Sequence, residues 1–174
     1  MLNYLKGRDS VTISMVCLGN ICRSPMAAAI LFNRKDEIVA PKINVDSSGT
    51  SAWHVGEGPN PHSKQTWESH GLKYEHRAKQ FSKNDFFISD LILVMDASNY
   101  VNVMAQADEA NQHKVFYLRQ FDPELRDVDR DSSDYEKLEV PDPYSLPIGK
   151  FEAVYEMIDK AVSGLLQELS RQVL

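Results

Sequence analysis

Two cysteines and an arginine fall within seven consecutive residues, 17–23, directly after an apolar run. The segment VCLGNICRSP joins the short, β-branched run VTISMVCL to SPMAAAILFNRK, in which good helix formers follow Pro25. We therefore predict a loop that leads from the end of a strand into the start of a helix. Such a loop directs backbone N–H groups and the positive end of the helix dipole into one small cavity, which suits an oxyanion such as phosphate.

The side chains of this loop could act on the anion that its backbone would hold. Arg23 is a planar, bidentate phosphate donor, and the small Gly19 lets the loop close around an ion. A cysteine at the cavity floor feels the same positive field, which favours its nucleophilic thiolate form. Cys17 would then lie beneath a phosphorus atom for in-line phosphoryl transfer. From these residues alone, phosphoryl transfer, arsenate reduction and simple phosphate capture all remain open.

The elements around this loop alternate between strand and helix patterns. Apolar runs such as SDLILVMD suit buried parallel strands. We predict a doubly wound α/β fold with a four-stranded parallel sheet, helices on both faces and the loop near the topological switch point. The expected strands cover residues 11–18, 41–50, 89–96 and 114–118, and the expected helices cover 24–35, 64–72, 97–107 and 151–174.

Composition limits the classes of protein to consider. The chain has 174 residues, of which 43% are hydrophobic, so we expect one domain over 1–174, with residues 1–10 as an N-terminal extension. The net charge of -6 argues against binding to nucleic acid or to an anionic membrane. No segment approaches the ~20 apolar residues of a membrane span or resembles a secretory signal, which favours a cytoplasmic protein. Because that compartment is reducing, we expect the two cysteines to serve through their reactivity rather than as a structural disulfide.

Several motifs together resemble one known family. The motif CLGNICRSP after the first strand, with DPY late in the chain, resembles the low-molecular-weight protein tyrosine phosphatases. Further segments, DSSGTSAWHVGEGP, HGLKYEHRAKQ, LILVMDASN, VPDPY and FEAVYEMI, resemble family segments in the same order and cover most of residues 11–170. The resemblance implies hydrolysis of phosphotyrosine in proteins, and of aryl phosphates generally, with inorganic phosphate as product. It implies no metal and no organic cofactor, and we expect a monomer.

The resemblance also assigns catalytic roles. Cys17 takes the position of the nucleophile that forms a cysteinyl-phosphate, and Arg23 that of the residue that binds phosphate and stabilises the transition state. Asp142, in the DPY segment, takes the position of the general acid that protonates the leaving phenolate and then activates water. Taken alone, an Asp-Pro pair in the acidic, pattern-poor stretch 119–144 would be read as a turn starter.

A second group of residues matches family positions that support the loop. Asn20, Ser47 and His76 match a network that holds the loop in a strained shape, with Asn20 in a left-handed conformation. Ser24 matches the hydroxyl that hydrogen-bonds the thiolate, although a serine before Pro25 could equally cap a helix. Asp96 matches an acidic position that supports the loop, with capping of the following helix as the plain alternative.

The resemblance further assigns a substrate cleft and a redox partner. Leu18, Ile21, Trp53 and Tyr144 match positions whose apolar and aromatic side chains would sandwich a phosphotyrosyl ring. Cys22 matches a second cysteine that forms a reversible disulfide with the nucleophile in many members and so protects it from irreversible oxidation. A small, unreactive loop residue is the alternative for Cys22.

The chain departs from the common family pattern at two places. Ser145 stands where many members have a second tyrosine after DPY, which argues against regulation by tandem tyrosine phosphorylation. Asn60 and His62 stand where the family often has an aspartate and an arginine, which removes a cation from the mouth of the cleft. Substrate preference is the property that this second change would affect.

Four other protein classes compete with this assignment. Protein-arginine phosphatases share the fold but resemble CTGNTCR, with threonine in place of Ile21, so they are the minority alternative. Arsenate reductases with the same loop need a further cysteine pair, which this chain lacks. A phosphate-binding module without activity would be expected to have lost Cys17 or Asp142. The larger receptor-type tyrosine phosphatases have histidine before the nucleophile, where this chain has Val16.

Overall fold

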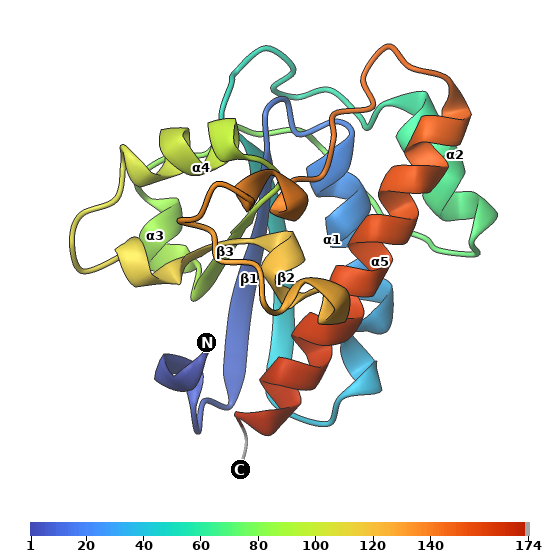
Figure 1. The fold of residues 1–174 in the computed structure, drawn as a ribbon. Helices are drawn as coiled ribbons and strands as arrows, with labels where there is room; N and C mark the ends of the chain where they lie inside the picture. The colour runs from blue at the N-terminus through green and yellow to red at the C-terminus, as the bar shows by residue number, and fades with distance from the viewer. Residues whose placement is uncertain (173–174) are drawn as a thin grey trace.

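The computed structural model describes residues 1–172, which form a four-stranded, fully parallel sheet with helices packed against it (Figure 1). The strands are β1 (Ser10–Cys17), β2 (Lys42–Gly49), β3 (Leu91–Val94) and β4 (Val115–Tyr117). Their spatial order is β2-β1-β3-β4, so the chain leaves β1 on one side for β2 and later returns to the other side for β3. This is a doubly wound sheet, as predicted, with its switch point between β1 and β3.

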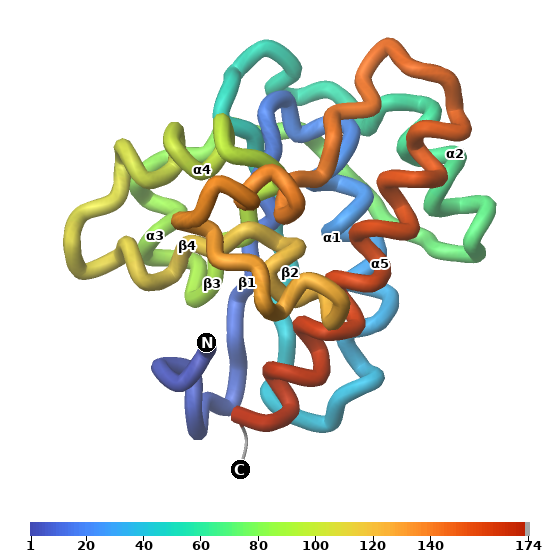
Figure 2. Tube along the Cα trace, in the orientation of Figure 1, coloured from blue at the N-terminus to red at the C-terminus, as the bar shows by residue number. Residues whose placement is uncertain are grey.

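Helices cover both faces of the sheet, which follows from the burial of every strand on two sides. Helices α1 (Arg23–Arg34) and α5 (Ile148–Arg171) lie on one face, with α2 (Pro61–Ser69) beside them, while α3 (Asp85–Ile88) and α4 (Ala97–Met104) lie on the other (Figures 1 and 2). Successive side chains of a strand point to opposite faces. Ile13 and Met15 therefore enter the core beneath α1 and α5, and Val16 enters the core beneath α3 and α4.

The structure corrects several predicted helix limits. Helix α2 begins at Pro61 rather than 64, because the Asn60 side chain accepts a hydrogen bond from the His62 N–H at 2.9 Å and Pro61 suits the first helical turn. It ends at Ser69, before Gly71 adopts a φ of 80°. Helix α5 begins three residues earlier than predicted, and helix α4 ends three residues earlier than predicted. The four-residue helix α3 was not predicted. Residues 173 and 174, placed in the last predicted helix, lie outside the described residues.

The acidic stretch 119–144 is built from short 3-10 turns anchored by buried apolar side chains. The turns are Leu118–Phe121, Pro123–Leu125 and Tyr135–Leu138, and Phe121 and Leu138 are buried. The amino-terminal segment is also packed into the core, since Leu2 and Leu5 are buried ahead of β1. In the part of the chain that the structure describes, none of the helices combines the length and apolar character needed to cross a bilayer.

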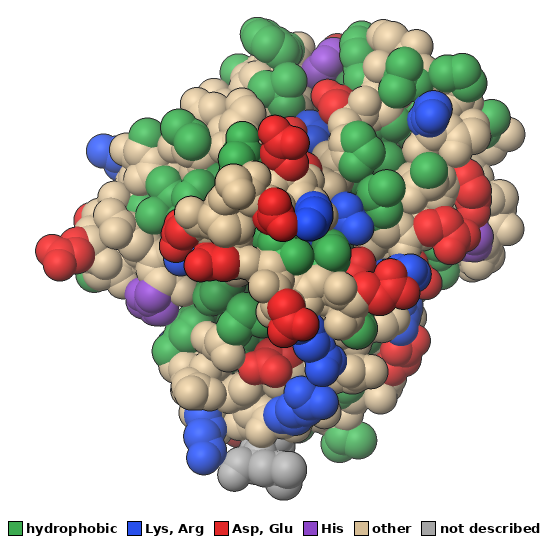
Figure 3. Space-filling model, viewed as in Figure 1, with side chains coloured by type: hydrophobic (Ala, Val, Ile, Leu, Met, Phe, Trp, Pro, Cys, Tyr) green, Lys and Arg blue, Asp and Glu red, His purple; other side chains and the backbone are tan. Residues whose placement is uncertain are grey.

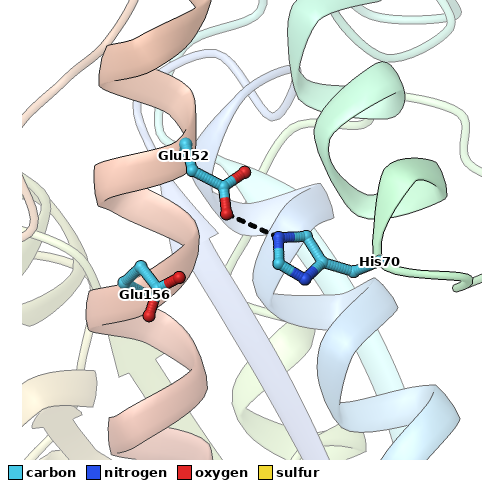
Figure 4. Close-up of side chains that lie close together, drawn as sticks. All are labelled: His70, Glu152 and Glu156. Atoms are coloured by element: carbon cyan, nitrogen blue, oxygen red, sulfur yellow. Dashed lines mark hydrogen bonds and ion pairs between the residues drawn. The ribbon is translucent and has the colours of Figure 1, made fainter.

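A polar contact ties the end of α2 to α5. The Nε2–H of His70 donates to a carboxylate oxygen of Glu152 at 2.6 Å (Figure 4). The His70 ring also stacks on Tyr155, with ring centroids 3.8 Å apart. Glu156 lies one turn along α5, close enough for the three side chains to offer metal-ligand atoms within 4.8 Å of one another. The Nε2 atom already has a partner and His70 is exposed, so we assign the group the structural role of joining the two helices.

A close backbone approach within the core gives a stability test. A Cβ built on Gly164, in α5, would lie 1.7 Å from the carbonyl oxygen of Phe121, whereas one on Gly149, in the same helix, meets nothing within 4 Å. We expect Gly164→Ala to lower the free energy of unfolding by about 2–3 kcal/mol, because α5 must move away from the 119–144 stretch. Gly149→Ala, the matched control, should cause no loss. Urea unfolding of both variants measures the difference, and equal stabilities would contradict this packing.

Candidate active site

The turn between β1 and α1 closes around a cavity of about 180 Å³ at the carboxyl edge of the sheet. Its position next to the switch point between β1 and β3 is the usual place for ligands in open α/β sheets. The structure brings together here residues that are distant in the sequence. The cavity is lined by Cys17, Leu18, Gly19, Ile21, Cys22, Arg23, Trp53, His54, Asp142 and Tyr144.

The sulfur of Cys17 lies at the buried end of this cavity and contacts two hydrogen-bond donors. The Ser24 hydroxyl is 3.0 Å from Sγ, and the Asn20 backbone N–H donates to Sγ at 3.3 Å. The Asn20 amide also donates to the Ser24 oxygen at 2.8 Å, so the hydroxyl proton of Ser24 can point at the sulfur or at the Ser48 carbonyl oxygen, which lies 3.4 Å away. Cys17 is 2% exposed, so its sulfur is accessible through the cavity rather than from the open surface.

Asn20 adopts a left-handed backbone conformation with a φ of 57°, which turns the loop inward. Every polar group of its side chain has a partner. Nδ2 donates to the hydroxyls of Ser24 at 2.8 Å and Ser47 at 3.0 Å, while Oδ1 accepts from the Lys79 N–H at 3.0 Å. Because Asn20 is fully buried, these bonds also remove the cost of burying its amide.

His76 holds the same residue from outside the loop. Its Nε2 lies 2.6 Å from the Asn20 carbonyl oxygen, which can only accept, so Nε2 carries the proton. Burial lowers the pKa of His76 below its ordinary value of 6.5, against the opposing effects of the Asn20 carbonyl and the Asp46 carboxylate. The imidazole is therefore a neutral donor at neutral pH.

Gly49, at the end of β2, permits the loop to lie against the sheet and was missed by the sequence analysis. A Cβ at this position would lie 2.7 Å from the Leu18 carbonyl oxygen and 3.0 Å from the Asn20 nitrogen. Its place at the end of a predicted strand was the available signal, since glycine in a strand often marks a close backbone approach.

Arg23 is 2% exposed. One nitrogen of its guanidinium binds neighbouring protein groups, and the others are directed at the cavity. Nη1 donates to Asp96 at 2.6 Å and to the Val140 carbonyl at 3.0 Å. Nε has no hydrogen-bond partner among the described residues. Burial opposes the charge, but the Cys17 sulfur and the Asp96 carboxylate outweigh it and raise the pKa of the guanidinium. Within the described part of the chain, Nη2 makes no hydrogen bond and has only the Asp142 carboxylate near it, at 3.6 Å, so the edge formed by Nε and Nη2 can take two oxygens of an anion.

Asp96 and Asp142 both lie against this guanidinium but differ in their surroundings. Asp96 also accepts the Asn99 N–H at 2.8 Å and so caps α4. The sequence left capping of the helix and support of the loop as alternatives, and Asp96 contacts both Arg23 and the start of α4. Asp142 lies 3.6 Å from Nη2 with 42% of its side chain exposed, so it stands at the mouth. The Val140 N–H donates to the Met95 carbonyl at 2.7 Å, which brings this segment from far along the chain to the end of β3.

Aromatic side chains form the outer walls of the cavity. Trp53 and Tyr144 are 74% and 53% exposed, whereas Ile21, deeper in the cavity, is 8% exposed. His54, which the sequence analysis did not select, lines the same wall with Nδ1 2.6 Å from Glu57. Its position next to Trp53 in a Gly/Pro-rich loop was the only sequence signal for it.

Cys22 shares the cavity with Cys17 but has a different environment. Burial, with smaller contributions from Cys17 and Asp142, raises the pKa of Cys22 to about 12, so it is a thiol at neutral pH. Its carbonyl accepts the Ser63 hydroxyl at 2.7 Å, and the Asn60 N–H donates to the Ile21 carbonyl at 2.8 Å. The start of α2 therefore holds the far side of the loop.

Comparison with known proteins identifies the family to which this loop belongs. The family profile described as low molecular weight phosphotyrosine protein phosphatase matches residues 12–174. The chain belongs to this family. A putative low molecular weight protein-tyrosine-phosphatase of Synechocystis is 38% identical over 161 residues, which cover 91% of this chain and 96% of the relative. The family membership expected from the motifs is confirmed.

Solved structures share the fold and include two enzyme classes by name. A protein tyrosine phosphatase from Entamoeba histolytica matches with a TM-score of 0.80 and 27% identity, covering 92% of this chain and 97% of that one. A Drosophila arginine phosphatase matches with a TM-score of 0.75 and 31% identity, covering 90% and 96%. The substrate therefore has to be inferred from the walls of the cavity rather than from the fold.

The half-buried His76 predicts a pH effect on stability. Because folding lowers the pKa of His76 below 6.5, its contribution to stability is complete above pH 6.5 and is lost as the pH falls through the lowered value. In His76→Gln, the amide can still donate to Asn20 but does not titrate. We expect wild type to lose more free energy of unfolding than this variant between about pH 7.5 and 5.5. Parallel curves in urea unfolding would show that His76 does not contribute in this way.

Proposed function

We propose that this protein hydrolyses phosphotyrosine in proteins through a cysteinyl-phosphate intermediate. The observation that supports it best is the juxtaposition of a buried Cys17 sulfur, the unpartnered Nε of Arg23 and the Asp142 carboxylate around one cavity. Together they supply a nucleophile, an anion site and a proton donor. The aromatic walls above them suit an aryl phosphate.

In the first step, the Cys17 thiolate attacks phosphorus from below and the bond from phosphorus to the phenolic oxygen breaks. The Nε and Nη2 groups of Arg23 and the loop amides hold the equatorial oxygens, and protonated Asp142 gives its proton to the departing phenolate. In the second step, Asp142 takes a proton from water, which attacks phosphorus and breaks the phosphorus–sulfur bond. Inorganic phosphate leaves, and the Ser24 hydroxyl stabilises the returning thiolate.

Hydrolysis of phosphoarginine is the second candidate, because two structural neighbours are named as arginine phosphatases. The walls favour the aryl ester. Ile21 presents an apolar side chain to the cavity, and Trp53 and Tyr144 offer faces on which a phenyl ring can pack. We further propose that the enzyme acts in the cytoplasm, a reducing compartment in which its two cysteines would stay unpaired. A monomer is our proposal for its oligomeric state.

Replacement of the proposed nucleophile and acid tests the mechanism. We expect Cys17→Ser to abolish p-nitrophenyl phosphatase activity, and Asp142→Asn to lower kcat on phosphotyrosyl peptides by about 10²-fold or more through loss of the general acid. Asp127→Asn, which changes an exposed carboxylate in the same acidic stretch, is the matched control and should retain activity. Steady-state kinetics measures all three, and unreduced turnover by Cys17→Ser would overturn the proposal.

The substrate class is decided by the same purified enzyme on paired peptides. Phosphotyrosyl and phosphoarginyl versions of one sequence should differ in kcat/KM in favour of the first. A reversed preference would leave the role of Cys17 as nucleophile intact but would show that the substrate is phosphoarginine.

The two cysteines predict protection during oxidation. Peroxide would oxidise the Cys17 thiolate to a sulfenic acid and be reduced to water, after which the Cys22 thiol would displace a second water to form a disulfide. We expect reversible inactivation of wild type, with a Cys17–Cys22 bond visible by mass spectrometry. Cys22→Ala should recover poorly when thiol is added, because Cys17 would proceed to the sulfinic acid. Equal recovery of the two proteins would rule out this protective role.

A further inference from the structure

A second hollow of about 350 Å³ lies beside the catalytic cavity and shares a wall with it. Tyr144 lines both, so the two spaces meet at this side chain. The hollow is a groove between the start of α2 and the segment that leads into α5, which arches over that helix end in Figure 1. It is lined by Asn60, Pro61, His62, Tyr144, Ser145, Leu146 and Phe151.

The floor and one side of this groove are fixed to the phosphate loop. The Asn60 N–H donates to the Ile21 carbonyl at 2.8 Å, while the Asn60 side chain is used to cap α2. The His62 ring packs edge-on against Phe151, with ring centroids 5.3 Å apart, so an aromatic pair forms the far end. A ligand in the groove would therefore lie at a defined distance from an anion in the loop.

Part of the surface of the groove and of the mouth is apolar and exposed to solvent, beside the polar Asn60 and Ser145. Tyr144 is 53% exposed and Leu146 is 43% exposed, and Trp53 stands across the mouth at 74%. Figure 3 shows hydrophobic side chains gathered over the part of the molecule where the arch and the start of α2 lie. Apolar surface next to a deep anion site is the combination that recognises a peptide rather than a small phosphate ester.

Two acidic side chains are exposed near the mouth. Glu57 and Asp142 have 59% and 42% of their side chains exposed. Among the residues that line the two hollows, Arg23 is the one lysine or arginine, and its side chain is buried beneath the cavity. An acidic residue next to the phosphorylated one would be repelled here, whereas an uncharged apolar residue would not.

We propose that this groove is a subsite for an apolar side chain of the substrate protein, within two residues of the phosphorylated tyrosine. The inference rests on the proposed function. An extended peptide advances about 3.3–3.6 Å per residue, and side chains two positions apart point the same way. With the phosphotyrosyl ring between Trp53 and Tyr144, a neighbouring side chain can cross Tyr144 and pack against Leu146 and Phe151.

Matched peptides test the subsite. One phosphotyrosyl sequence carries leucine, serine or glutamate at each of the two positions before and after the phosphotyrosine, and kcat/KM is measured for each. At one of these positions we expect wild type to prefer leucine over serine by about fivefold, because burial of an apolar side chain favours binding. Glutamate should rank below serine, because the exposed Glu57 carboxylate repels it and a charged side chain gains nothing from packing against Leu146. The serine peptides separate the apolar contribution from this charge effect.

Two variants locate the preference on the protein. Leu146→Ser removes one wall and should reduce the leucine-to-serine ratio to below about twofold. Phe87→Ser is the matched control, because Phe87 is a 77% exposed apolar residue on α3, outside both hollows, and its removal should leave the ratio unchanged. A ratio near one in wild type at all four positions, or a ratio that Leu146→Ser does not change, would overturn the subsite.

The experiment also distinguishes this inference from the proposed function. If phosphotyrosyl peptides are hydrolysed without a leucine preference, the subsite is wrong and the function stands. If the enzyme hydrolyses only phosphoarginyl peptides, the proposed function is wrong. The same leucine and serine series on a phosphoarginyl core then decides whether the groove acts as a subsite for that substrate.

Discussion

A chain that wraps seven residues around an anion must turn its amide groups inward, and here this depends on Asn20 in the left-handed region at a φ of 57°. For a residue other than glycine this conformation is costly, so it persists only where other contacts hold it. Ser24, Ser47, Lys79 and His76 supply those contacts. Because Ser47 comes from β2 and the other two distant partners from the segment after α2, the shape of the loop depends on tertiary contacts as well as on its own sequence.

Arg23 connects that local geometry to the rest of the fold. Its Nη1 donates hydrogen bonds to Asp96, two residues after β3, and to the Val140 carbonyl. Val140 belongs to the segment that carries Asp142. The guanidinium is rigid and planar, so fixing one nitrogen orients the whole group. This leaves Nε and Nη2 facing the cavity at no further entropic cost when an anion arrives. A single buried side chain thus connects the proposed anion site with the mouth of the cavity, where Asp142, the proposed proton donor, lies.

The sequence was sufficient to predict the alternating strands, the doubly wound sheet and the loop, because each rests on a local pattern of apolar residues followed by a turn. It was not sufficient for contacts that arise only when distant segments meet. Gly49 has a role only because Leu18 lies against it, and the position of Asp142 depends on a backbone bond between Val140 and Met95. Asp142 was selected by family resemblance, since local spacing does not distinguish it from the other aspartates of the acidic stretch. The start of α2 was misplaced because its cap, Asn60, lies in a Gly/Pro-rich loop.

The way the walls are attached explains how one loop can serve different substrates. The wall segments bind the phosphate loop through their backbones: Thr50 and Ser51 donate to the carbonyls of residues 17 and 18, and Asn60 donates to that of Ile21. These bonds do not depend on side-chain identity, so Trp53, His54, Glu57 or His62 can change without moving the nucleophile. Specificity can therefore vary while the chemistry stays fixed, consistent with tyrosine and arginine phosphatases sharing this fold. For this chain the walls combine apolar and aromatic side chains with the polar Asn60 and Ser145, and we expect this combination to select the substrate.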